Sequence, residues 1–131
     1  MWRSISASRF VDATGTLSVL EHPESLPFKV ERVFWLSNIS LGAIRGQHAH
    51  LDLRQVLVCL KGSCSLELLN VIGESQTITL IEGGSVLYIE GIVWRTLKDF
   101  TTDCCLLVLC DKPYKEDKVL RTFAEFKAAQ L

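Results

Sequence analysis

The sequence lacks both a surplus of charge and a long hydrophobic run. Its 131 residues include 14 lysines and arginines against 15 aspartates and glutamates, so the formal net charge is −1. Proteins that bind nucleic acid or an acidic membrane surface usually carry a basic surplus, and this balance fits neither class. No apolar run approaches the roughly 18 residues of a membrane span, and the mixed N-terminus predicts no signal peptide. We therefore expect a cytoplasmic protein without nucleic-acid or membrane partners.

The sequence also lacks paired cysteines. The five cysteines are odd in number, contain no Cys-x-x-Cys motif and mostly lie within apolar runs. Tetrahedral zinc sites are built from closely spaced ligand pairs, and disulfide frameworks use an even number of cysteines. We therefore expect buried, reduced thiols of the kind found in the cytosol.

Short apolar runs, many alternating with polar residues, recur about every ten residues, and turn residues separate them. This pattern predicts an all-β sandwich, jelly roll or barrel. The predicted strands cover residues 17–20, 33–36, 56–60, 64–69, 76–81, 85–89, 94–97 and 104–110. Residues 119–130 favour a helix with an apolar side. We expect one domain over residues 1–131, a small β-barrel with a short C-terminal helix.

Two histidines stand out in the segment Arg45-Gly-Gln-His-Ala-His50. Successive side chains of a strand point to opposite faces, so His48 and His50 share one face. The uncharged run that begins at Gln55 and follows them is typical of a buried strand. Polar groups directed at a core are costly unless they have partners. The pair therefore indicates either a metal site or proton chemistry.

The spacing matches the first motif of the cupin barrels, in which Gly, His-x-His, Glu and Gly recur at fixed intervals. The matching positions are Gly42, His48, His50 and Gly62. Gln55 stands at the Glu position, and Arg95 stands where a second motif has its fourth metal ligand. These exchanges remove a negative charge and add a positive one, and two positive charges about 4 Å apart repel by roughly 4 kcal/mol in an effective dielectric near 20. We therefore expect no metal and a cavity for an anionic or polyhydroxylated ligand.

With these motifs the chain resembles the WxcM-like, FdtA-type dTDP-4-keto-6-deoxyglucose 3,4-ketoisomerases, a metal-independent branch of the cupins. The resemblance covers nearly the whole chain, and its most specific part is Arg-Gly-x-His-Ala-His followed by Gln-Val-Leu-Val-Cys-Leu. The matching stretches are residues 12–17, 27–28, 32–33, 45–50, 55–63, 93–95, 99–100 and 114–126.

The resemblance implies a homodimeric cupin jelly roll that binds a dTDP-linked 4-keto-6-deoxy sugar without a cofactor. It implies an isomerase that moves the carbonyl from C4 to C3 through an enediol, in deoxyamino-sugar biosynthesis for polysaccharides such as O-antigen or for a glycosylated product. By the same resemblance His48 is the catalytic histidine, and His50 and Arg45 line its pocket. The family has His or Arg at the position of Arg95, a choice linked to the C4 configuration of the product, and Arg resembles the gluco branch.

The residues also suit this reaction on physical grounds. Proton transfer between C3 and C4 needs a group with a pKa near neutral pH, so His48 and His50 are the catalytic candidates. The candidates to stabilise the enediolate are Arg45, Gln55 and Arg95. The candidates to bind the diphosphate are Arg32 and Arg54. Trp94 either packs in the core or stacks on the base or sugar of the substrate.

Two positions depart from the family. Many members have Val-Tyr-Tyr, whose first tyrosine assists the proton shuttle, whereas this chain has Phe34 there. Thr14 replaces a larger residue linked to product stereochemistry. Water, His50 or the substrate can replace the missing phenol, so a non-catalytic nucleotide-sugar-binding cupin remains an alternative. A metal-dependent cupin enzyme that uses His48 and His50 is a third, which Gln55 and Arg95 disfavour.

Overall fold

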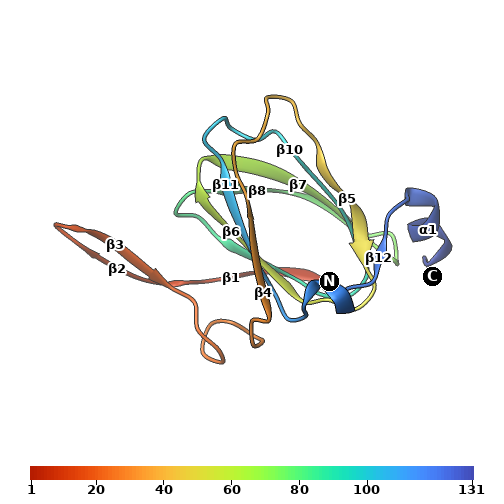
Figure 1. The fold of residues 1–131 in the computed structure, drawn as a ribbon, viewed down its shortest axis with the longest axis horizontal. Coiled ribbons are helices and arrows are strands. Elements are labelled where there is room, and N and C mark those ends of the chain that lie inside the picture. Colours follow the sequence, from red (N-terminus) through yellow and green to blue (C-terminus); the bar gives the residue numbers. More distant parts are fainter.

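Two five-stranded antiparallel sheets face each other in the structure, a computed structural model that describes residues 1–131 (Figure 1). The strand order is β1-β9-β6-β11-β4 in the first sheet and β12-β5-β10-β7-β8 in the second. The strands of the first sheet are β1 (Trp2–Ile5), β9 (Val86–Ile89), β6 (Gln55–Lys61), β11 (Cys105–Cys110) and β4 (Arg32–Leu36). Those of the second are β12 (Val119–Leu120), β5 (Arg45–His50), β10 (Val93–Lys98), β7 (Ser63–Asn70) and β8 (Ser75–Ile81).

Alternation along the strands fills the space between the sheets with apolar side chains. In β10 every second residue, beginning at Val93, is buried. The core that results is a cluster of 16 residues in which leucine predominates, and each fully buried leucine contributes about 1.5–3 kcal/mol. Of the 26 buried residues, only His50, Gln55 and Arg95 are polar or charged. The polar end of the core therefore coincides with the histidine segment.

The predicted all-β jelly roll is confirmed, and each predicted run forms a strand within a residue or two of its expected ends. The two sheets are not joined by hydrogen bonds into a closed ring, so the jelly roll is a sandwich of two facing sheets. The sequence did not reveal β1, β2 and β12. β1 and β12 have only four and two residues, too few for a periodic signal, and every residue of β2 is exposed, so it has no buried side to mark it.

The C-terminal helix α1 (Phe123–Ala128) is shorter than predicted. The preceding residues form a short 3-10 turn (Tyr114–Glu116) and then β12, which pairs with β5. Thr122 ends the extended segment, and its hydroxyl accepts a hydrogen bond from the backbone N–H of Glu125, as expected of an N-cap. Phe126 anchors the helix in the body of the protein. Neither helical segment has the length and apolar character needed to cross a membrane.

A hairpin of β2 (Ser8–Asp12) and β3 (Gly15–Val19) projects away from the two sheets (Figure 1). Every residue of β2 is exposed, including Phe10 at 62% and Val11 at 75%. A two-stranded hairpin is at best marginally stable alone in water. The hairpin therefore has an apolar surface that no other part of this chain covers.

Candidate active site

The histidine segment lies on β5, beside the inner face of β10. Arg95 of β10 is directly opposite His48, while the next residue of β10 pairs with Gly46, so β5 contains one extra residue. Gly46 and Gln47 have positive φ values of 79° and 55° at this bulge. The positive φ of Gly46 favours glycine, and a Cβ atom there would lie 3.1 Å from the backbone oxygen of Arg95 and 2.9 Å from Cδ1 of Leu97. Bulges of this kind re-aim side chains next to active sites.

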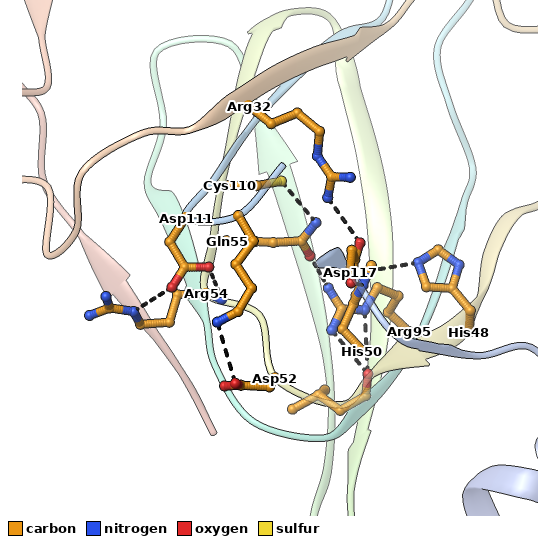
Figure 2. Close-up of polar contacts among 12 residues, drawn as sticks. Arg32, His48, His50, Asp52, Arg54, Gln55, Arg95, Cys110, Asp111 and Asp117 are labelled. Atoms are coloured by element: carbon orange, nitrogen blue, oxygen red, sulfur yellow. Dashed lines mark hydrogen bonds and ion pairs between the residues drawn. The ribbon is translucent and has the colours of Figure 1, made fainter. Parts of the chain in front are cut away.

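The two imidazoles contact each other (Figure 2). Nε2 of His48 lies 3.0 Å from Nε2 of His50, and the rings are perpendicular with centroids 4.7 Å apart. A hydrogen bond between two nitrogens needs one N–H and one lone pair, so one proton lies between the rings. The pair can therefore pass a proton between its members.

Asp117 anchors this pair from the other end of the chain (Figure 2). Its Oδ1 lies 2.8 Å from Nδ1 of His50, and its Oδ2 accepts a 2.9 Å hydrogen bond from Arg32. The pairing of β12 with β5 brings Asp117 there, because the backbone N–H of Leu51 donates to the carbonyl of Lys118. Sequence analysis missed Asp117, because its contact with His50 spans 67 positions. The only signal was its place in the polar part of the tail that resembles the family.

Arg95 and Gln55 form the floor of the site. The guanidinium of Arg95 donates to Oε1 of Gln55 and to the carbonyl of Val93. The amide of Gln55 donates to Sγ of Cys110 at 3.5 Å. Both side chains are only about 4% exposed, and no carboxylate contacts the guanidinium. A buried cation whose direct partners are all neutral is suited to stabilise negative charge on a ligand.

The surrounding groups keep both imidazoles neutral at neutral pH. Burial, followed by the charge of Arg95, lowers the pKa of His50 to about 4 and lowers the pKa of His48. Burial also lowers the pKa of Arg95 to about 10, so it stays charged. Burial raises the pKa of Asp117, but the hydrogen bonds from Arg32 and His50 outweigh this and leave the pKa below its usual value. The site thus combines an ionised acid, two neutral bases and a buried cation.

Two cavities meet at His48 and Phe34. The inner cavity, of about 120 Å³, lies between the sheets and reaches Arg45, Gln55 and Arg95. The outer cavity, of about 330 Å³, is bordered by Arg32, His48, His50, Tyr114, Asp117 and Arg121. His48 is thus accessible from both sides. The aromatic ring of Phe34 contributes no hydroxyl to either cavity.

The structure brings most of the predicted site residues together, but Trp94 and Arg54 lie outside both cavities. Arg45, His48, Gln55 and Arg95 line the inner cavity, and Arg32, His48 and His50 line the outer one. Trp94 lies on the opposite face of β10, where it packs against Phe123 and Phe126 of α1. Arg54 pairs with Asp111 at the surface. Arg121 and Tyr114 line the outer cavity although no pattern in the sequence singled them out.

Comparisons with known proteins agree with this geometry. The sequence model of a family described as FdtA, WxcM-like, C-terminal, matches residues 2–130. A TDP-4-oxo-6-deoxy-α-D-glucose-3,4-oxoisomerase from Aneurinibacillus thermoaerophilus is 37% identical over 125 residues, which are 94% of this chain and 88% of that protein.

Solved structures give the same result. QdtA, a sugar 3,4-ketoisomerase from Thermoanaerobacterium thermosaccharolyticum in complex with TDP, is 33% identical with a TM-score of 0.91 over 97% of this chain and 92% of QdtA. A QdtA mutant in complex with TDP-4-keto-6-deoxyglucose is 32% identical with a TM-score of 0.90 over 97% of this chain and 91% of that one.

Proposed function

Because the chain belongs to the FdtA (WxcM-like, C-terminal) family, we infer that it is a nucleotide-sugar 3,4-ketoisomerase. The enzyme moves the carbonyl of dTDP-4-keto-6-deoxyglucose from C4 to C3, a step of deoxysugar biosynthesis. The two relatives carry this activity in their names, and the QdtA mutant holds TDP-4-keto-6-deoxyglucose. The observation that carries the proposal is a neutral histidine pair beside a buried guanidinium that no carboxylate contacts.

The reaction moves two protons and releases none. His48 removes the proton from C3, which leaves an enediolate with its negative charge on the C4 oxygen. The proton of the C3 hydroxyl passes to the C4 oxygen, so the charge moves to the C3 oxygen. His48 then returns its proton to C4, and the C3 oxygen becomes the new carbonyl. Arg95 stabilises the negative charge that develops on the enediolate oxygens, because its charge lies in a site that excludes water. The gluco configuration at C4 is the product we expect from Arg95.

We assign the diphosphate of the substrate to Arg121. Its exposed side chain borders the outer cavity with His48 and forms no ion pair. The two arginines suggested by the sequence are already engaged, Arg32 with Asp117 and Arg54 with Asp111. Arg45, exposed at the inner cavity, is the second free guanidinium near His48. Free guanidinium groups at a cavity mouth suit a diphosphate.

We further propose a homodimer. The outer face of the first sheet exposes Val33 at 47%, Trp35 at 63% and Leu60 at 50%. A groove of about 770 Å³ runs between this face and the projecting hairpin of β2 and β3. A second copy with the same hairpin covers both surfaces by a symmetric contact, which is the commonest way for one chain to bury such a surface. The five unpaired thiols suit a reducing compartment, and we place the enzyme in the cytoplasm.

Proton NMR of the protein with dTDP-4-keto-6-deoxyglucose in deuterated water tests the function. We expect the C3 proton signal to disappear and a 3-keto product to form, with His48→Asn inactive. His22→Asn is the matched control, because His22 is an exposed histidine on a loop outside both cavities. The C4 configuration of the product then tests the assignment based on Arg95.

Two other outcomes have distinct meanings. Binding of dTDP without proton exchange would identify a nucleotide-sugar-binding cupin that lost turnover with the hydroxyl at Phe34. No exchange and no binding of dTDP would refute the proposed function.

A further inference from the structure

The two oxygens of the Asp117 carboxylate serve different partners. Oδ2 accepts a hydrogen bond from Arg32, whereas Oδ1 faces Nδ1 of His50 at 2.8 Å. The side chain of Asp117 is only 5% exposed, so water has little access to these contacts. Because Arg32 occupies one oxygen, the other is held toward His50.

We propose that Asp117 is a positioning residue that fixes which nitrogen of each histidine carries a proton, an inference that rests on the proposed isomerase function. An ionised carboxylate only accepts hydrogen bonds, so Nδ1 of His50 must carry the proton. In neutral His50, Nε2 is then a lone pair. The single proton between the rings therefore belongs to Nε2 of His48. Nδ1 of His48 is left unprotonated and is the base.

The same arrangement stores the charge that catalysis creates. When Nδ1 of His48 takes the C3 proton, the ring becomes an imidazolium. Its other proton can shift across the 3.0 Å contact to His50, which is then a cation beside the Asp117 carboxylate. The reverse shift returns this proton to Nε2 of His48, which then gives the proton on its Nδ1 back to C4 and regains its starting tautomer, so no proton is gained or lost. Phe34 lines both cavities and has no hydroxyl to hold this proton.

The charged groups around the histidine pair shift its pKa values in different directions, so the effect of Asp117 can be distinguished from the effects of its neighbours. Besides burial, Arg95 on β10 and Arg121 after β12 lower the pKa of His48. Arg32 on β4 contacts the far oxygen of Asp117. A hydrogen bond with the backbone of Gly46 and the charge of Asp117 both raise the pKa of His48, whereas Asp117 alone raises that of His50. Removal of its charge should therefore lower the pKa of His48, whereas removal of Arg95 or Arg121 should raise it.

The tautomers can be measured on the wild-type protein without any turnover. The chain has three histidines, so long-range 1H–15N spectra of 15N-histidine protein are readily assigned with His22→Asn and His48→Asn. We expect His50 as the Nδ1–H tautomer and His48 as the Nε2–H tautomer at neutral pH. The Nε2–H tautomer for His50 would overturn the proposal whether or not the protein is an isomerase.

The catalytic consequence is tested by Asp117→Asn, which keeps the shape and one acceptor oxygen but loses the charge. We expect kcat to fall by about tenfold or more with KM nearly unchanged, and the acidic limb of the kcat/KM profile to move to lower pH. Glu116→Gln is the matched control, an exposed acid on the same turn, and should behave as wild type.

A fall in kcat with an unmoved limb and unchanged tautomers would reduce Asp117 to a structural partner of Arg32. Absence of C3 proton exchange in the wild type would refute the isomerase function instead, and the tautomer spectra would still decide what Asp117 does to the histidine pair.

Discussion

The variant Arg95→Met tests whether the buried guanidinium of Arg95 serves catalysis or the stability of the fold. The guanidinium is almost fully buried, and its hydrogen bonds go to an amide and a backbone carbonyl rather than to a carboxylate. Methionine has a similar length and carries no charge. We expect this variant to fold about as stably as the wild type and to lose most of its activity.

The expected magnitudes follow from the burial of Arg95. A pKa of about 10 instead of 12.5 means that the site disfavours the cation by about 3 kcal/mol. Loss of the hydrogen bonds to Gln55 and Val93 costs about 1 kcal/mol each. The free energy of unfolding should therefore change by no more than about 1 kcal/mol. Removal of a donor aimed at the developing enediolate lowers kcat by about 10²- to 10³-fold.

Three measurements check this prediction. Urea unfolding gives the stability, NMR of the reaction in deuterated water gives kcat, and the pH profile gives the histidine titration. The acidic limb of kcat/KM should move to higher pH, because the charge of Arg95 lowers the pKa of His48 and His50. Lys98→Met, on the outer face of the same strand, is the control and should leave all three unchanged. A loss of more than about 3 kcal/mol of stability with an unchanged kcat would show that Arg95 is structural and refute the reasoning.

Three further predictions concern other parts of the chain. Arg121→Gln should raise KM for the dTDP-sugar about tenfold or more and leave kcat unchanged in steady-state assays, because it removes a charge-assisted hydrogen bond to the diphosphate. Burial raises the pKa of the thiol of Cys59 to about 12 and of Cys64 and Cys104 to about 11, so mass spectrometry should find these three unmodified when native protein is treated with iodoacetamide at pH 8. The folded-state pKa of Asp117 is lowered, so its contribution to stability is present above the unfolded pKa of about 3.9 and is lost as pH falls through the lower folded value. Unfolding free energies of the wild type and Asp117→Asn should therefore converge below about pH 4 and differ most above about pH 5.

The sequence was informative wherever a property repeats along a strand. Alternation predicted the strands, and the spacing of His48 and His50 predicted their shared face, because both follow from the two-residue period of an extended chain. The same alternation already places Trp94 outside the pocket. It is adjacent to Arg95 on β10 and therefore points to the other side of the sheet.

The sequence did not reveal contacts that depend on how distant segments of the chain meet. Asp117 reaches His50 because a strand of only two residues pairs with β5, and so short a strand leaves no periodic signal. The partners of Arg32 and Arg54 were equally invisible, since the carboxylates that engage them lie 85 and 57 positions away. Charge on a side chain can be read from the sequence, but whether that charge is free to bind a ligand depends on its partners in the fold.

The free and engaged arginines should respond differently to salt. The chain has a net charge of −1, yet the histidine pair is surrounded by four arginines and a single carboxylate. Arg45 and Arg121 are exposed, so salt screens their attraction for a diphosphate with a Debye length of about 8 Å at 0.15 M. Arg95 is buried and is screened far less. Raising the ionic strength from low to about 0.5 M should therefore raise KM several-fold in steady-state assays while kcat stays constant. A kcat that falls with salt in parallel with binding would mean that the charge acting on the enediolate is an exposed one, and that Arg95 is not its source.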